Sequence, residues 1–174
     1  MHINLAKILI KEYNLDKIFF VPVGNYYEKN DLIDAYHRYN MLKLAIEDNK
    51  QLEIEKIGLE SKIKLYASDT FKLIKEKYQK DNIFFVMGSD NFKKMPTWKN
   101  YEDLIKNYNI IVIERERKKI RNENPKNIIE FIPEKLASAD STKIRKMIKN
   151  NENTQKYLNP KVYKYIKQNN LYIC

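Results

Sequence analysis

The sequence predicts an α/β fold, a Rossmann-like doubly wound parallel sheet with a C-terminal helical appendage. Three short runs of continuous apolar residues, rich in β-branched and aromatic side chains, occur at residues 17–23, 82–87 and 109–113. Continuous runs of this kind indicate strands covered on both faces. Helical patterns alternate with them, which is typical of parallel strands joined by right-handed crossovers, with ligands bound at the carboxyl ends of the strands.

Each element follows from its own pattern. Residues 3–13 place Ala6, Leu9, Ile10 and Tyr13 on one helical face, and an alternating run at 52–57 is typical of an edge strand. The predicted helices are residues 3–13, 31–47, 68–78, 101–106, 141–149 and 160–167, and the predicted strands are residues 17–23, 52–57, 82–87, 109–113 and 128–132.

The length of 174 residues favours a single domain, residues 1–174, in which an α/β core at 1–135 is followed by helices at 136–174. A parallel α/β domain usually opens with a strand, whereas this chain opens on a helix with His2 at its start. We therefore expect a strand upstream of Met1.

Composition restricts the partners. The net charge of +10 is dispersed along the chain, and its densest basic run, residues 115–121, is expected to be a surface loop, so we predict no nucleic-acid partner. The single cysteine, Cys174, allows no internal disulfide and no cysteine metal cluster, which fits a cytoplasmic protein. Lys7 and Lys11 interrupt the apolar start, so we predict neither a signal peptide nor a membrane span.

Two segments carry candidate nucleotide-binding residues. Gly88-Ser89-Asp90 directly follows a predicted strand, where glycine permits a tight turn and aspartate can accept from ribose hydroxyls; ordinary turn residues are the alternative. Residues 140–145 open a helix, with Asp140 or Ser141 as N-cap, and with Thr142 and Arg145 beside the helix end. Such an end is suited to a phosphate, and plain capping is the alternative.

For two histidines and the tryptophan, the sequence is compatible with a structural or surface position as well as with ligand binding. His2 could meet a phosphate or be a surface residue, and His37 is expected at the surface. Trp98, the one tryptophan, could pack in the core or stack on a flat ligand. The sequence shows no metal-ligand spacing, no nucleophile held by a base and no Walker-type loop, so we predict no protein metal site and no covalent chemistry.

Taken together, several segments resemble the nicotinate- and nicotinamide-mononucleotide adenylyltransferases of the nucleotidyltransferase superfamily. The resemblance covers nearly the whole chain and is most specific where the Gly-x-Asp segment, the Pro-Thr-Trp-Lys loop and the Ser-Thr-x-Ile-Arg helix start occur in order. The matching segments are residues 21–25 with Lys29, 38–46, 69–70, 88–90, 95–99, 141–145 and 157–172.

The resemblance implies transfer of AMP from ATP to nicotinate or nicotinamide mononucleotide, with release of pyrophosphate. It implies that His2, Lys29 and Arg145 act on the phosphates, and that Mg²⁺ arrives bound to ATP. It further implies that Gly88, Asp90, Ser141 and Thr142 bind nucleotide, and that Trp98 and Arg38 bind substrate. Family members are often oligomeric, which leaves a homo-oligomer open.

The family joins its first strand to its first helix by a (His/Thr)-x-Gly-His motif, sometimes with Met-His in place of Gly-His. His2 has the spacing of the second histidine, so we expect the natural start to lie upstream of Met1 and the chain as numbered to turn over weakly or not at all.

The chain also departs from the family pattern. Ala67 replaces a threonine near the pyridine, residues 25–29 replace a Pro-Pro-His-Lys type segment, and Asp140 places a carboxylate near the phosphate site. Two alternatives therefore remain, a related enzyme with another acceptor, such as a cytidylyltransferase, and a non-catalytic nucleotide-binding protein.

Overall fold

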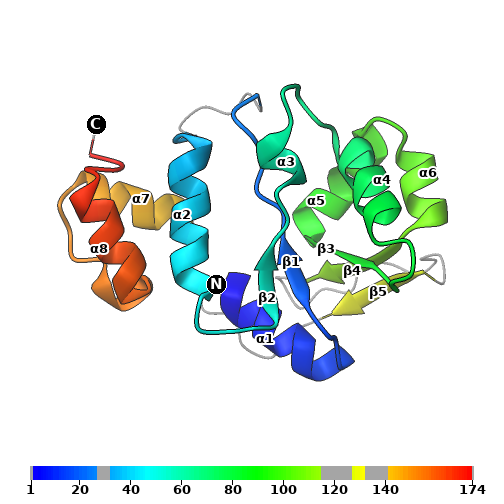
Figure 1. The fold of residues 1–174 in the computed structure, drawn as a ribbon, viewed down its shortest axis with the longest axis horizontal. Coiled ribbons are helices and arrows are strands. Elements are labelled where there is room, and N and C mark those ends of the chain that lie inside the picture. The colour runs from blue at the N-terminus through cyan, green and yellow to red at the C-terminus, as the bar shows by residue number, and fades with distance from the viewer. Residues whose placement is uncertain (1, 27–31, 115–126, 132–140, 174) are drawn as a thin grey trace. The chain divides into compact units, whose positions relative to one another are not determined.

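The computed structural model describes residues 2–26, 32–114, 127–131 and 141–173 (Figure 1). The chain divides into two compact units, which we describe separately. Unit 1 comprises residues 1–62 and 137–174, and unit 2 comprises residues 63–136. The single domain inferred from the sequence stays a prediction.

All five predicted strands are present, and every pairing between them is parallel. In unit 1, β1 (Ile18–Phe20) pairs with β2 (Leu52–Ile54). In unit 2, β4 (Asn109–Ile113) lies between β3 (Phe84–Gly88) and β5 (Ile128–Phe131). The predicted α/β class with parallel strands is confirmed.

The six predicted helices are also present. They are α1 (His2–Tyr13), α2 (Ala35–Ile46), α4 (Ala67–Lys77), α6 (Tyr101–Asn107), α7 (Ser141–Lys149) and α8 (Pro160–Gln168). Four short elements were missed, namely α3 (Ile57–Glu60), α5 (Ser89–Lys94) and two 3₁₀ turns, η1 (Met95–Thr97) and η2 (Gln155–Tyr157). Each is too short to display a helical period in its apolar residues.

Unit 2 is organised around the central strand β4. Ile110 and Val112 of this strand are sealed from solvent together with Met95 and Leu104, and Ile128 of β5 completes the cluster. In Figure 1, α4, α5 and α6 are drawn above the three strands of this unit. The continuous apolar run of β4 fits burial on both faces of the strand, since its last four residues are all buried.

Unit 1 has two clusters, and α2 contributes to both. One cluster contains Ala6 of α1, Ile46 of α2 and Leu52 of β2. The other contains Ile148 of α7 with three residues of α8 and the segment after it, and Met41 and Leu44 of α2 pack against it. Those three residues are Val162, Ile166 and Leu171. The C-terminal helices therefore pack on α2, as Figure 1 shows for α8.

A polar contact accompanies this packing. The Tyr165 hydroxyl of α8 lies 3.0 Å from Nδ1 of His37 and accepts a hydrogen bond from the Asn40 amide at 3.1 Å. His37 is half-buried, because its ring lies against Tyr165 while part of the residue stays at the surface. The residue that covers it, Tyr165 of α8, is 128 positions further along the sequence.

Asparagine ends three helices of unit 1. Asn14, Asn151 and Asn170 have φ values of 48°, 55° and 49°, and each follows the last turn of a helix. In each case the next residue donates its N–H to the carbonyl five residues back, as in a Schellman motif. These bonds run from Leu15 to Ile10 at 3.0 Å, from Glu152 to Met147 at 2.8 Å and from Leu171 to Ile166 at 3.1 Å.

The N-terminus of α2 is tied to the segment after β1. The Asp34 carboxylate accepts from the Tyr36 N–H at 2.7 Å, and its other oxygen accepts from the Asn25 amide at 2.6 Å. Asn25 in turn accepts from the Ala35 N–H at 2.7 Å. The hydrogen bonds from Tyr36 and Asn25 lower the pKa of Asp34 because they stabilise its charged form, and the bond from Tyr36 has the larger effect.

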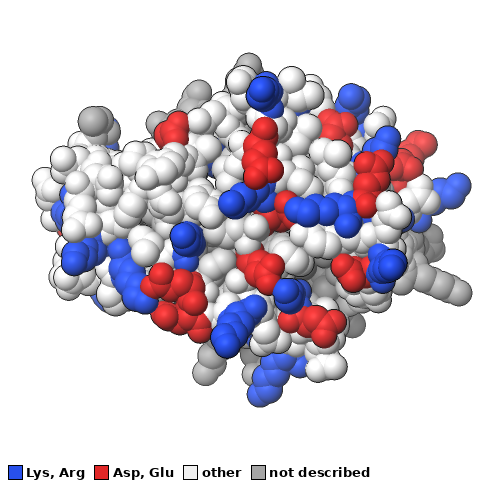
Figure 2. Space-filling model, in the orientation of Figure 1, with Lys and Arg blue, Asp and Glu red and all other residues white. Residues whose placement is uncertain are grey.

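No helix among the described residues is long and apolar enough to cross a membrane. On the face drawn in Figure 2, basic and acidic side chains are interspersed.

The Leu104→Ala substitution is expected to destabilise the protein by about 2–5 kcal/mol, because Leu104 is fully buried in the unit 2 cluster and alanine leaves a cavity there. Leu73→Ala, on the exposed side of α4 in the same unit, is the matched control and should cost less than about 1 kcal/mol. Urea unfolding of both variants measures the difference, and equal losses would contradict the assigned core.

Asp34→Asn is expected to lower the melting temperature at neutral pH and to have less effect in acid. The folded pKa of Asp34 is lowered, so its charge stabilises the fold above the unfolded pKa of about 3.9, and this contribution is lost as the pH falls. Asparagine still caps a helix but does not titrate. Melting curves at several pH values between 3 and 7 test this, and a difference that does not shrink in acid would refute it.

Candidate functional site

In unit 2 the candidate residues begin where β3 becomes α5. Gly88 is the last residue of the strand and directly precedes the helix, with φ −75° and ψ 153°. This conformation is open to any residue. The tight glycine turn suggested by the sequence is therefore a direct strand-to-helix junction at the carboxyl end of β3, and Asp90 lies exposed on the first turn of α5.

A buried polar pair lies at the same end of the sheet. Gly88 of β3 is paired with Ile113 of β4, so Ser89 and Glu114 are the first residues after the two neighbouring strands. The Ser89 hydroxyl donates to Oε1 of Glu114 at 3.0 Å, and the residues are 1% and 3% exposed. Sequence reasoning missed Glu114. The available signal was a carboxylate directly after an apolar strand.

Trp98 follows the 3₁₀ turn of the Met95-Pro96-Thr97 segment. The backbone N–H of Trp98 donates to the Met95 carbonyl at 2.9 Å, and the half-buried indole ring packs against the unit 2 cluster. Nearby on the chain, Nζ of Lys99 lies 5.2 Å from the centre of the exposed Tyr66 ring. The core contact of Trp98 is thus present, and part of the indole remains accessible to a ligand.

In unit 1 the predicted helix start at Ser141 is the first residue of α7. Ser141 and Thr142 are exposed on the first turn, and Nη2 of Arg145 lies 3.3 Å from Oγ1 of Thr142. The first turn of α7 carries no acidic residue, and Asp140 lies outside the described residues. Helix N–H groups, a hydroxyl and a guanidinium thus lie together in an arrangement suited to an anion.

Arg38 is engaged by the backbone. Its guanidinium donates to the carbonyls of Ile33, Val23 and Gly24 at 2.9, 2.6 and 3.3 Å. Burial lowers the pKa of Arg38, and Asp34 acts in the opposite direction. The side chain therefore braces the segment that follows β1, a structural role that the sequence did not suggest.

The same segment lies against α3 at two glycines. A Cβ built on Gly24 would lie 2.4 Å from the Gly58 carbonyl oxygen, and one on Gly58 would lie 2.5 Å from the Pro22 carbonyl oxygen. Side chains are therefore excluded at both positions, and the backbones make direct contact. The segment after β1 is therefore held by backbone packing as well as by Arg38.

Tyr172 is influenced electrostatically by both arginines of unit 1. It packs against the α7–α8 cluster with φ 65°, and burial raises the pKa of its hydroxyl. Arg145 and then Arg38 act in the opposite direction, so both guanidinium groups lie within electrostatic reach of this one ring.

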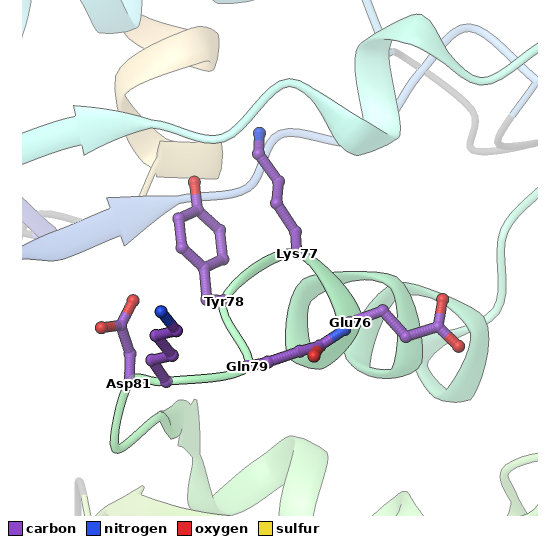
Figure 3. Close-up of a pocket in the computed structure, with 6 residues that line it drawn as sticks. Glu76, Lys77, Tyr78, Gln79 and Asp81 are labelled. Carbon is purple, nitrogen blue, oxygen red and sulfur yellow. The ribbon is translucent and has the colours of Figure 1, made fainter.

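The remaining candidates are placed as follows. His2 is the exposed first residue of α1, and Lys29 lies outside the described residues. No group of three His, Cys, Asp or Glu side chains in the described segments is placed to hold a metal ion. The hollow in Figure 3, at the end of α4, is lined by six consecutive residues, 76–81, and by none of the candidate residues.

Comparison with known proteins identifies the family. The cytidylyltransferase-like family model matches residues 1–147. A probable nicotinate-nucleotide adenylyltransferase of Clostridium botulinum (strain Okra / Type B1) is 34% identical, covering 98% of this chain and 91% of that protein. The nicotinate-nucleotide adenylyltransferase of Bacillus subtilis (strain 168) is 31% identical over 98% of this chain and 90% of its own.

Solved structures agree with this result. Plasmodium falciparum nicotinic acid mononucleotide adenylyltransferase complexed with NaAD superposes with a TM-score of 0.79 at 23% identity, covering 98% of this chain and 89% of that one. The same enzyme complexed with APC gives a TM-score of 0.74 at 26% identity, covering 95% and 88%. The first likeness supports the Rossmann-like fold. Because the family model and relatives above 30% identity cover most of its length, the chain belongs to the nicotinate-nucleotide adenylyltransferases within the cytidylyltransferase-like nucleotidyltransferases.

Proposed function

We propose that this protein transfers AMP from ATP to the 5′-phosphate of nicotinate mononucleotide, forming the dinucleotide and pyrophosphate in NAD biosynthesis. The observation that carries the proposal is the nearly full-length match to proteins named nicotinate-nucleotide adenylyltransferase. The geometry agrees with a nucleotide site, since candidate residues follow β3 and open α7.

The reaction needs cations more than nucleophiles. The mononucleotide phosphate attacks the α-phosphorus of ATP in line, so the protein has to hold two anionic groups together and stabilise charge on the departing pyrophosphate. In unit 1, Arg145 beside Thr142 at the start of α7 is suited to this task. We assign His2 and Lys29 to the same phosphates on the family resemblance.

The remaining assignments concern binding. In unit 2, Gly88 and Asp90 hold the nucleotide backbone and ribose, and the accessible part of Trp98 stacks on the pyridine ring. In unit 1, Ser141 and Thr142 present the end of α7 to the ATP phosphates. Arg38 supports the substrate site by fixing the Val23 and Gly24 carbonyls. Mg²⁺ enters with ATP as part of the substrate. A cytoplasmic location and a homo-oligomer stay predictions.

The direct test is pyrophosphate release with ATP and Mg²⁺, supplied separately with nicotinate mononucleotide and with nicotinamide mononucleotide. We expect release to require nicotinate mononucleotide and the dinucleotide to form in equal amount. A second form, extended upstream to the next in-frame start, tests the expectation about Met1. Release with CTP and another acceptor, and none with either mononucleotide in both forms, would replace the proposal with a cytidylyltransferase.

Arg145→Ala, made in the form that turns over, is expected to lower kcat/KM about 100-fold, because a guanidinium that stabilises phosphate charge in the transition state is lost. Arg145→Lys should restore only part of the activity, since lysine cannot donate in a bidentate manner. Lys146→Ala, exposed one residue further along α7, is the matched control. If the two alanine variants had equal kcat/KM, Arg145 would have no role in catalysis.

A further inference from the structure

The Ser89–Glu114 pair has no part in the assignments above. Both residues lie beyond the last paired positions of β3 and β4 and are almost completely buried, with the serine hydroxyl 3.0 Å from a carboxylate oxygen. A hydrogen bond between two buried side chains satisfies polar groups that water cannot reach. It joins the carboxyl ends of two neighbouring strands.

Stability alone does not account for this pair. The four residues before Glu114 are buried and apolar, so an apolar residue at 114 would extend this buried run without removing a carboxyl group from water. Burying a carboxylate is costly even when it has a partner, and apolar replacements of buried charged groups often stabilise a protein. A polar side chain at this position therefore indicates a role in the site.

Helix α5 shows what the pair controls. The helix has six residues, and its N-cap Gly88 provides no side-chain hydrogen bond. A helix this short does not hold its position by itself. Two of its side chains anchor it, Ser89 to Glu114 and Phe92 to the unit 2 cluster. Asp90 is exposed and lies between these two anchors in sequence, so the backbone that carries its carboxylate is held by them.

We propose that Glu114 is a positioning residue for the nucleotide: by accepting the hydrogen bond of Ser89 it fixes the first turn of α5, and with it the Asp90 carboxylate that takes the ribose. The inference rests on the proposed function for the identity of the nucleotide. It adds two buried residues to the site, neither of which needs to touch the ligand.

Ser89→Ala tests the inference because it removes only the hydroxyl. We expect the KM for ATP to rise about tenfold, the scale of one or two hydrogen bonds, with kcat nearly unchanged, since a ribose contact is made equally in the ground and transition states. Ser68→Ala is the matched control. Ser68 is also buried on the first turn of a helix in unit 2, and its hydroxyl has no hydrogen-bond partner among the described residues.

A double-mutant cycle separates positioning from general support of the fold. If Ser89 acts through Asp90, the same substitution in an Asp90→Ala background should change the KM for ATP less than twofold, because mutations acting on one interaction are not additive. Equal effects in both backgrounds, or a Ser89→Ala variant with the KM of the unmodified protein, would overturn the proposal.

Substitutions of Glu114 provide a second test. Glu114→Gln keeps an acceptor oxygen for Ser89 and should stay close to the unmodified protein, whereas Glu114→Ala should match Ser89→Ala. For each variant of the cycle, the Kd for ATP is also measured, from the fluorescence of Trp98, the one tryptophan. If the protein binds ATP but does not use nicotinate mononucleotide, the proposed function fails while the binding cycle still decides the role of Glu114.

Discussion

Strand β4 hydrogen-bonds to a parallel partner on each side, and four of its five residues are sealed from water. This arrangement fixes the level at which the neighbouring strands end. Gly88 and Ile113 are paired, so the residues that follow them emerge at one edge of the sheet. The positions of the short helix α5, of Asp90 on its first turn and of the buried Glu114 all depend on this register.

Arginine has two different uses in unit 1. Arg38 gives three hydrogen bonds to backbone carbonyls and so orders the segment after β1, whereas Arg145 has a side-chain partner, Thr142, on the exposed first turn of α7. Tyr172 lies within electrostatic reach of both. The C-terminal helices therefore do more than extend the fold, because they bring a candidate phosphate-binding residue and its neighbours onto α2.

The strands and long helices could be predicted because their signals are local. The run at 109–113 is apolar throughout, and residues 3–13 repeat their apolar positions at helical spacing. Helix α5 was missed because six residues hold less than two turns. The contact of His37 with Tyr165 was not predicted because it joins residues 128 positions apart in the sequence. The Ser89–Glu114 bond depends on strand register, which a single sequence does not reveal.

Asparagine, not glycine, ends three helices in left-handed conformations, and none of the described glycines has a positive φ. Asparagine tolerates this conformation through local hydrogen bonding, yet it is restricted by its side chain when the chain is unfolded. Each such helix end therefore loses less backbone entropy on folding than a glycine would. A chain with three glycines in 174 residues therefore has a more restricted unfolded ensemble, and less entropy is lost when its helix ends form.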